Sequence, residues 1–482
     1  MRYHREVGRR TLAWLCLSAL TAGTLAFACS SFDSNADAPP ETSPDGSADS
    51  CATCAAEAGT GDAGSDASVD AGVDAGDTIL EVTTGDAFGC AVMASKKVFC
   101  WGRNNEKQIG QPAADPDFAC DSNTKCRPTP VEVPGLSDVV HVAAGLDFAC
   151  ATTSTGAVKC WGQNSQGNLG SGTATPPTRP TPDVVPGLPP ALDVVAGAFN
   201  ACARVTEDGG TEVYCWGRND KQILGLASDG IFGPTRVAGL TGAKSVVLDL
   251  FSEHACAILA DDTVVCWGHN GYGGLGHVLG ANGESSGPCP GGGGATYCNP
   301  TPRPVSGGGF KASEVAVGYF FSCARELTSS KVFCWGDNQY GCLGRGGPSD
   351  AVTNATPVEV PGLGVATSLS AKRTHACAVA GGTVHCWGAQ TSGELANGNA
   401  NDTCGATPCK TSPQNVAALM GVDRVTVGGN YSTARTAAGA YYAWGANGDG
   451  RLGHVPGQSS DLVTCAPGAG RCNPVPQLLV VP

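Results

Sequence analysis

The sequence has little charge, few aromatic residues and almost no methionine. Charged residues make up 15% of the 482 residues, aromatic residues 6%, and there are 3 methionines. Acidic residues outnumber basic ones by 43 to 29, and a net charge of −14 argues against the basic footprint of a nucleic-acid-binding protein, although it leaves room for a small local basic patch. We therefore expect no nucleic-acid partner. The low charge, together with 69 glycines and 31 prolines, predicts short strands and tight turns rather than long helices.

Common catalytic and nucleotide-binding motifs are also missing. The sequence contains no Walker loop, no H-E-x-x-H and no G-x-S-x-G. Residues 271–276 match G-x-G-x-x-G, but they lie inside a repeat copy and no βαβ unit surrounds them. The histidines are scattered without metal-ligand spacing. We therefore expect no catalytic residue, no metal site and no cofactor within any one segment, which leaves open an active site assembled from several repeats.

The cysteine content and the first 29 residues predict an exported protein. Twenty-five cysteines are too many for a reducing compartment unless they bind metal. Four arginines within the first ten residues precede an apolar run, so residues 1–28 are predicted to be an export signal. The run ends in Leu-Ala-Phe-Ala-Cys29, which resembles a bacterial lipobox. We expect a lipid anchor on Cys29 in the bacterial cell envelope, facing the periplasm or the exterior; plain secretion is the alternative.

Residues 29–78 are predicted to be a disordered tether. The segment consists mainly of Ala, Asp, Gly, Ser and Pro, and it holds eleven acidic residues and no Lys or Arg. Such a composition buries too little apolar surface to offset the loss of chain entropy. Cys51 and Cys54 form a Cys-x-x-Cys pair here without further ligands nearby, so we expect a local or an intermolecular disulfide.

The rest of the chain repeats one phrase seven times: Trp-Gly, usually followed by Asn and then by Gly-x-Leu-Gly. The intervals between successive copies are 60, 55, 51, 68, 52 and 57 residues, a period typical of a propeller or a solenoid. The copies begin at Trp101, Trp161, Trp216, Trp267, Trp335, Trp387 and Trp444.

The second copy predicts the structure of the unit. Residues 139–145 alternate like a strand, residues from 150 and residues 158–161 form two more around a turn, and residues 182–188 supply a fourth. Four antiparallel strands make one propeller blade. We therefore predict an all-β fold, a seven-bladed β-propeller of four-stranded antiparallel blades over residues 79–482.

Two cysteines of each of the first six copies face each other across the predicted hairpin. Facing residues of a non-hydrogen-bonded pair lie close enough for a disulfide. In the seventh copy Thr433 and Ala443 replace both partners together, which pairing predicts and independent thiols do not. The expected bridges are Cys90–Cys100, Cys150–Cys160, Cys202–Cys215, Cys256–Cys266, Cys323–Cys334 and Cys377–Cys386.

Within the third strand, Cys and Trp lie on opposite faces, and neighbouring blades are expected to bury both. The Trp-Gly pair is thus predicted to be packing, with the indole N–H satisfied locally beside a Gly that allows close approach. His254 and His375 occupy a repeat position two residues before a cysteine, where other copies carry aromatic residues. We therefore interpret them as repeat residues rather than as catalytic bases.

Four copies carry a second cysteine pair in the loop after Gly-x-Leu-Gly. Their shared position in the repeat predicts that the stapled loops lie on one face of the disc, where they either form a binding surface or only resist proteolysis. Cys342 has no obvious partner and is expected to be a buried free thiol. The predicted pairs are Cys120–Cys126, Cys289–Cys298, Cys404–Cys409 and Cys465–Cys472.

These repeats resemble the regulator of chromosome condensation repeat family. The second copy carries the motif as Gly145, Cys150-Ala151, Val158-Lys159-Cys160-Trp161-Gly162-Gln163-Asn164 and Gly167-Asn168-Leu169-Gly170. The resemblance implies a seven-bladed propeller that closes by pairing both chain ends, residues 79–82 and 475–481, within one blade. Phe251 and Lys372 replace the leading Gly, and Gln390 replaces the Asn, so we expect irregular fourth and sixth blades.

The first functional hypothesis is a tethered extracytoplasmic binding module that presents the stapled loops to a protein or a glycan. The alternative is a hydrolase or lyase that acts on polysaccharide at the central channel. Guanine-nucleotide exchange, an activity of eukaryotic family members, conflicts with the predicted export.

Overall fold

The computed structural model describes residues 77–482 apart from residues 113–117, 121–123, 252, 279–288, 290–296, 306–308, 397–401 and 458–470. The predicted export signal, the tether up to residue 76, and Cys29, Cys51, Cys54 and Cys465 lie outside the described residues. The described chain is all strand, turn and loop, and it contains no helix long and apolar enough to cross a membrane.

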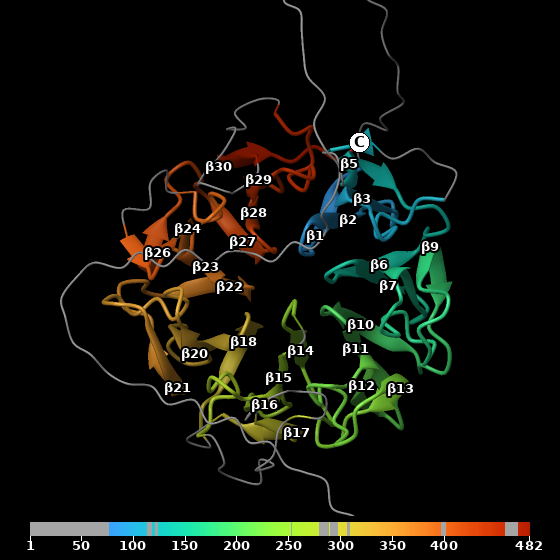
Figure 1. Cartoon of the computed structure of the whole chain (residues 1–482), viewed down its shortest axis with the longest axis horizontal. Helices are drawn as coiled ribbons and strands as arrows, with labels where there is room; N and C mark the ends of the chain where they lie inside the picture. Colours follow the sequence, from blue (N-terminus) through green and yellow to red (C-terminus); the bar gives the residue numbers. More distant parts are fainter. Residues whose placement is uncertain are drawn as a thin grey trace, which may run out of the picture. The chain divides into compact units, whose positions relative to one another are not determined.

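Seven antiparallel sheets surround a central axis as the blades of a propeller, which confirms the predicted fold (Figure 1). The chain enters each blade at its innermost strand and moves outward. Blades 1 and 6 carry an additional short strand, β4 and β25. Blade 1 consists of β1 (Ile79–Thr84), β2 (Phe88–Met93), β3 (Val98–Arg103), β5 (Lys125–Glu132) and β4 (Phe118–Ala119), blade 2 of β6 (Val139–Ala144), β7 (Phe148–Thr153), β8 (Val158–Gln163) and β9 (Thr178–Val184), and blade 3 of β10 (Ala191–Ala196), β11 (Asn200–Glu207), β12 (Gly210–Arg218) and β13 (Ile231–Arg236). Blade 4 consists of β14 (Ser245–Leu248), β15 (His254–Ile258), β16 (Val264–His269) and β17 (Cys298–Pro304), and blade 5 of β18 (Ala312–Val317), β19 (Phe321–Glu326), β20 (Val332–Asn338) and β21 (Asp350–Glu359). Blade 6 consists of β22 (Ala366–Lys372), β23 (His375–Ala380), β24 (Thr383–Ala389), β26 (Thr407–Asn415) and β25 (Asp402–Cys404), and blade 7 of β27 (Val422–Val427), β28 (Tyr431–Thr436), β29 (Tyr441–Ala446) and β30 (Cys472–Leu478).

The fourth strand of blade 2 begins four residues before its predicted start, at Thr178 rather than at residue 182. Its sequence contains Pro180 and Pro182, which an outer strand tolerates because one edge needs no ladder hydrogen bonds. The prediction followed the apolar pair Val184-Val185, but Val185 lies just after the strand and is buried, with 3% of its surface exposed.

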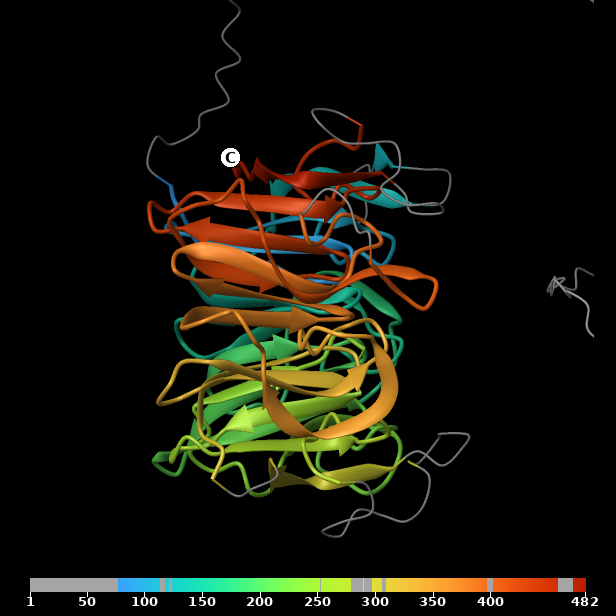
Figure 2. The same ribbon diagram turned by 90° about the vertical axis from the view of Figure 1, so that its left-hand side faces the viewer.

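The strand order gives the propeller two distinct faces. One, the loop face, carries the turns between the first and second strands and the long loops between the third and outer strands. The other, the hairpin face, carries the turns between the second and third strands and the connections to the next blade. Figure 2 shows the strands running from one side of the disc to the other.

The hydrophobic core lies between neighbouring blades. In one cluster, Phe88, Cys90 and Val98 of blade 1 pack with Val142 and Trp161 of blade 2. All seven repeat tryptophans are buried, with at most 1% of their surface exposed, as predicted. Burying both faces of each sheet follows from the radial arrangement, because each blade covers its neighbours.

The expectation that the indole N–H is satisfied locally is wrong. Trp161 Nε1 donates to Gln108 O of the preceding blade over 2.9 Å. Every repeat tryptophan makes the same bond, always to the carbonyl of residue x in the preceding Gly-x-Leu-Gly segment. One copy of the phrase therefore binds the next copy, a relation that the spacing within a single copy does not reveal.

The Asn and the Gly of the phrase fix the loop that presents this carbonyl. Asn164 Oδ1 accepts the Leu169 N–H at 3.1 Å and so closes the turn. Gly162 has a φ of 102°, and an added Cβ would lie 2.7 Å from Asp147 O. A side chain is therefore excluded here by both conformation and space.

The predicted closure, with both chain ends in one blade, is wrong. β1 belongs entirely to blade 1 and β30 entirely to blade 7. Side chains join the two blades instead: Thr84 Oγ1 donates to Val427 O at 2.6 Å, and Trp101 Nε1 donates to Arg451 O at 2.9 Å. β1 pairs with β2 and β30 pairs with β29, so each terminal strand belongs to the blade formed by its own sequence neighbours.

Candidate interaction face

The stapled loops begin at one equivalent position of the repeat. Cys126, Cys298, Cys409 and Cys472 each lie on an outer strand, directly opposite the residue that follows a Trp-Gly pair. This register places all four at the loop face, in blades 1, 4, 6 and 7. Three of these blades are consecutive around the ring, because blade 7 adjoins blade 1.

Nine disulfides occur among the described residues, and all nine join predicted partners. The six hairpin bridges have Cα–Cα distances of 4.0 to 4.1 Å, the close spacing of facing strand residues. Cys472 is also disulfide-bonded, while its predicted partner Cys465 lies outside the described residues. Cys342 is a buried free thiol.

In several copies, the side chain at residue x also contacts the inner turn of the following blade. Gln108 Nε2 donates to Asp147 Oδ1 at 2.9 Å, and Asn168 Nδ2 donates to Ala198 O at 2.9 Å. The Cys342 thiol donates to Thr374 O at 3.2 Å, which gives this unpaired cysteine a structural role. In these copies residue x joins neighbouring blades twice, through its carbonyl and through its side chain.

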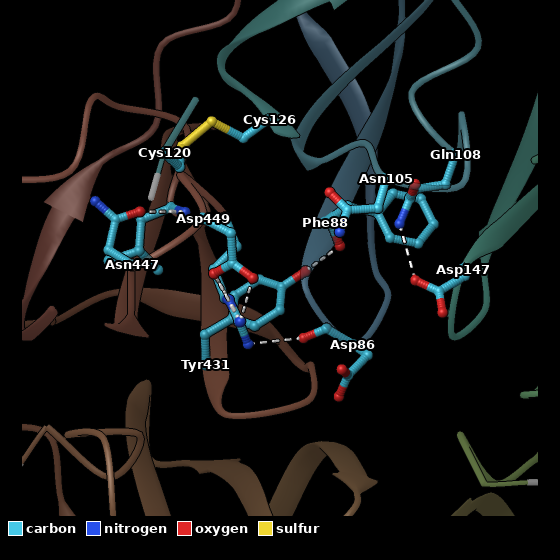
Figure 3. Close-up of polar contacts among 12 residues, drawn as sticks. Asp86, Phe88, Asn105, Gln108, Cys120, Cys126, Asp147, Tyr431, Asn447 and Asp449 are labelled. Atoms are coloured by element: carbon cyan, nitrogen blue, oxygen red, sulfur yellow. Dashed lines mark hydrogen bonds and ion pairs between the residues drawn. A yellow bond between two sulfur atoms is a disulfide. The ribbon is translucent and has the colours of Figure 1, made fainter. Parts of the chain in front are cut away.

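A polar network also joins blades 7 and 1 (Figure 3). Arg451 donates to both carboxylate oxygens of Asp449 at 2.7 Å and to Asp86 O at 3.0 Å. Its guanidinium lies over the ring of Tyr431, whose hydroxyl donates to Phe88 O. These contacts hold the inner turns of the loop face in fixed positions.

A cluster of aromatic rings lies on the loop face where blades 4 and 5 meet. The ring of Phe320 lies 3.8 Å from that of Tyr319 and 4.5 Å from that of Tyr272, and Tyr319 lies 5.0 Å from Phe251. All four are partly exposed. Phe320 has a φ of 67°, in the left-handed region that bulky residues rarely adopt. Such strain is common at binding sites.

Buried ionisable groups lie beneath this aromatic cluster. Burial raises the pKa of Asp249 to about 8, and no side-chain donor pairs with either carboxylate oxygen of Asp249. Glu253 Oε2 lies 3.5 Å from His269 Nδ1 and 3.7 Å from Lys221 Nζ. Burial also lowers the pKa of His269 to about 4, so the imidazole is neutral at physiological pH. No cluster of three or more potential ligands in the described part of the chain could hold a metal ion.

His254 and His375 are structural, as predicted. Both are fully buried, and burial lowers the pKa of each to about 3. Their Nε2 atoms contact Ser322 Oγ at 2.8 Å and Ser432 Oγ at 3.0 Å on the following blade. Neutral imidazoles thus join blades 4 and 5, and blades 6 and 7.

The central channel contains a cavity of about 450 Å³, lined by the innermost strand of every blade. Both carboxylates in its lining are ion-paired: Glu81 with His141 at 2.9 Å and Glu314 with Arg325 at 3.2 Å. The second nitrogen of His141 contacts Val194 O at 2.9 Å. Because both carboxylates are engaged with basic side chains, the cavity gives less support to the hydrolase or lyase alternative than to binding.

The stapled loops could be located from the sequence, whereas the aromatic cluster could not. Its members come from the turns of blades 4 and 5 and from one phrase loop, so no single copy of the repeat contains it. A signal did exist: Phe251 stands at the Gly position of the turn, and Tyr319 and Phe320 follow that position in the next copy.

The comparisons with known proteins agree with this architecture. Two models of the regulator of chromosome condensation (RCC1) repeat match, one at residues 79–108, 139–168, 252–273 and 312–342, the other at residues 97–152 and 329–379. The ultraviolet-B receptor UVR8 of Arabidopsis thaliana is 26% identical over 383 residues, or 78% of each chain. The human E3 ubiquitin-protein ligase HERC2 is 28% identical over 372 residues, which cover 74% of this chain and 7% of that protein.

Solved structures show the same fold. Human WBSCR16 superposes with a TM-score of 0.63 at 18% identity, covering 80% of this chain and 94% of that one. Prp20p of Saccharomyces cerevisiae superposes with a TM-score of 0.62 at 19% identity, covering 84% of this chain and 87% of that one.

The fold and its loop face define a disulfide-rich seven-bladed β-propeller that offers broad loops on a rigid disc. Within that class, the matched repeats make this chain similar to RCC1-repeat proteins.

Proposed function

We propose that the protein is an extracytoplasmic binding module whose loop face captures a protein or a glycan. The observation that carries the proposal is the common register of Cys126, Cys298, Cys409 and Cys472, which puts four stapled loops on one face. Loops on a rigid scaffold are the usual place of recognition. Stapling limits the conformational entropy that these loops lose on binding.

The aromatic cluster strengthens the choice of this face. Partly exposed Tyr and Phe side chains give large contact areas with few rotatable bonds, and such residues are enriched where proteins bind partners. Tyr272 and Phe320 lie in blades 4 and 5, and the Cys289–Cys298 loop also belongs to blade 4. The cluster and this stapled loop therefore belong to one surface.

The chain enters the propeller at the hairpin face, opposite the proposed binding face. Asp77, the first described residue, accepts hydrogen bonds from Ser95 N at 2.8 Å and Ser95 Oγ at 2.6 Å, in the first turn of the hairpin face. An anchor at Cys29 would therefore attach to the propeller through the hairpin face and leave the loop face accessible to a partner. Labelling cells with a radioactive fatty acid tests the anchor: Cys29→Ala must abolish incorporation.

The binding proposal is tested by affinity capture with residues 77–482, followed by mass spectrometry of what is retained. Two variants replace the Cys289–Cys298 and Cys404–Cys409 loops by short Gly-Ser turns. A matched control replaces residues 437–439, a turn of the hairpin face in blade 7. We expect loss of the captured partner in the loop variants and unchanged capture in the control. Equal capture by all of them refutes the loop face as the binding site.

A further inference from the structure

The central cavity differs in chemistry from one side of the axis to the other. β6, β10 and β14 contribute mainly apolar residues, of which Val195 and Val247 are partly exposed. β18, β22 and β27 lie across the axis in Figure 1 and contribute hydroxyl groups and the two cations of the lining. These residues are Ser313, Ser368, Ser370, Lys372, Arg424 and Thr426.

Arg424 is the polar group of this cavity with the most unused bonding capacity. Its side chain is exposed and lines the cavity, and its guanidinium has neither a hydrogen bond nor an ion pair with any described residue. The five donors of an arginine fit a carboxylate or a similar acid group. The two carboxylates of the lining are already paired, Glu314 with Arg325 at 3.2 Å and Glu81 with His141 at 2.9 Å.

Lys372 adds a second positive charge on the same side of the cavity. Its amine donates to Thr84 O, which uses one of three donor positions. Burial lowers its pKa to about 8, while the charges of Asp249 and Asp86 oppose that shift. The amine is therefore largely charged at pH 7 and, like Arg424, attracts an anion.

We propose that the central cavity binds a small organic monoanion, whose acid group pairs with Arg424 while its apolar body lies against β6 and β10. A volume of about 450 Å³ is within the range of small-molecule sites. The inference is independent of the proposed function, because the loop variants described above leave the cavity intact.

Isothermal titration of residues 77–482 tests the proposal with octanoate and 1-naphthoate as probes. Octan-1-ol supplies the apolar body without the acid, and inorganic phosphate supplies charge without the body. We expect one-to-one binding of at least one organic anion, with the alcohol and the phosphate at least about tenfold weaker, as the loss of a charge-assisted bond implies.

Two variants and a control locate the site. Arg424→Gln and Val195→Asp should each weaken anion binding at least about tenfold, the first by removing the cation and the second by placing a like charge on the apolar wall. Lys125→Gln removes a charge from an exposed residue of β5 outside the cavity and should change nothing. Because the Arg424 side chain is exposed and unbonded, its variant is expected to fold, which thermal unfolding checks.

Absence of binding by both organic anions overturns the proposal. Equal affinity for octan-1-ol or for phosphate, or unchanged affinity in Arg424→Gln, overturns it as well.

Discussion

The seventh blade offers a direct test of the hairpin disulfides, because it lacks one. Thr433 and Ala443 face each other in β28 and β29 at the register that Cys150 and Cys160 occupy in blade 2. Both are buried, with 2% and 1% of their surface exposed. We predict that the double substitution Thr433→Cys and Ala443→Cys forms a seventh hairpin bridge without changing the fold.

The expected gain follows from the length of the closed loop. The natural bridge of blade 2 spans a sequence separation of 10, as would the new one. Chain-entropy arithmetic gives about 2.7 kcal/mol for a loop of this length. With an unfolding entropy of about 2.1 cal/mol/K per residue over roughly 400 residues, this gain corresponds to a rise in Tm of about 3 °C. The lost hydrogen bond from Thr433 Oγ1 to Thr426 O, 3.4 Å long, offsets little of it.

Thermal unfolding of the wild type, the double variant and the two single variants measures the effect. The double variant should show no additional free thiol and a higher Tm than the wild type, whereas neither single variant should gain stability. Reduction should remove the difference, because the new bridge then opens with the others. Free thiols at residues 433 and 443 in the oxidised double variant, or a Tm no higher than that of the wild type, refute the argument that this position of each hairpin is built for a disulfide.

Three further predictions concern buried polar groups. His254 has a folded pKa lowered to about 3, so the free energy of unfolding falls as the pH decreases below the unfolded pKa of about 6.5, by about 2 kcal/mol at pH 5. The urea concentration at the midpoint of unfolding should therefore decrease less between pH 7 and pH 5 in His254→Gln than in the wild type. Asp249 has a folded pKa raised to about 8, so its contribution to the free energy of unfolding declines as the pH rises from 3.8 to 8. In urea unfolding, Asp249→Asn should be more stable than the wild type by at least about 2 kcal/mol at pH 8, and this difference should disappear toward pH 4. Trp161→Phe leaves Gln108 O without its donor and should lower the free energy of unfolding by about 1–3 kcal/mol, measured by the same method.

Much of the fold could be predicted because the sequence repeats the same structural unit seven times. The joint replacement of two cysteines by Thr433 and Ala443 was enough to pair the others, since it revealed a facing relation that spacing alone does not. The shared position of the extra cysteines likewise placed the stapled loops on one face, because equivalent positions of a repeat lie on the same side of a ring. Repetition thus supplied the comparison that a single copy lacks.

Contacts between copies could not be predicted in this way. The hydrogen bond from Trp161 to Gln108 O joins two copies of the repeat, and the periodic pattern shows only which residues recur, not which residues of different copies contact each other. Closure failed for the same reason, because residues 79–82 and 475–481 are equally strand-like whether they share a blade or complete separate blades. The aromatic cluster was missed because Phe251, Tyr272 and Phe320 come together only after blades 4 and 5 are packed.

The exception at residue x explains why the rings gather where they do. At the blade 4–5 junction, residue x is Gly274, which provides the carbonyl for Trp335 but has no side chain to contact the next turn. A Cβ at Gly274 would lie 3.0 Å from Phe320 O and 3.4 Å from His254 Cε1. The absence of a side chain at Gly274 therefore leaves the space that the strained turn at Phe320 occupies. The rings of Tyr272 and Phe320 then occupy the junction that Gln108 or Arg451 fills elsewhere with hydrogen bonds. A partly exposed aromatic surface thus lies where Gln108, Asn168 and Arg451 make hydrogen bonds at other junctions. This difference between copies directs the search for recognition to this part of the loop face.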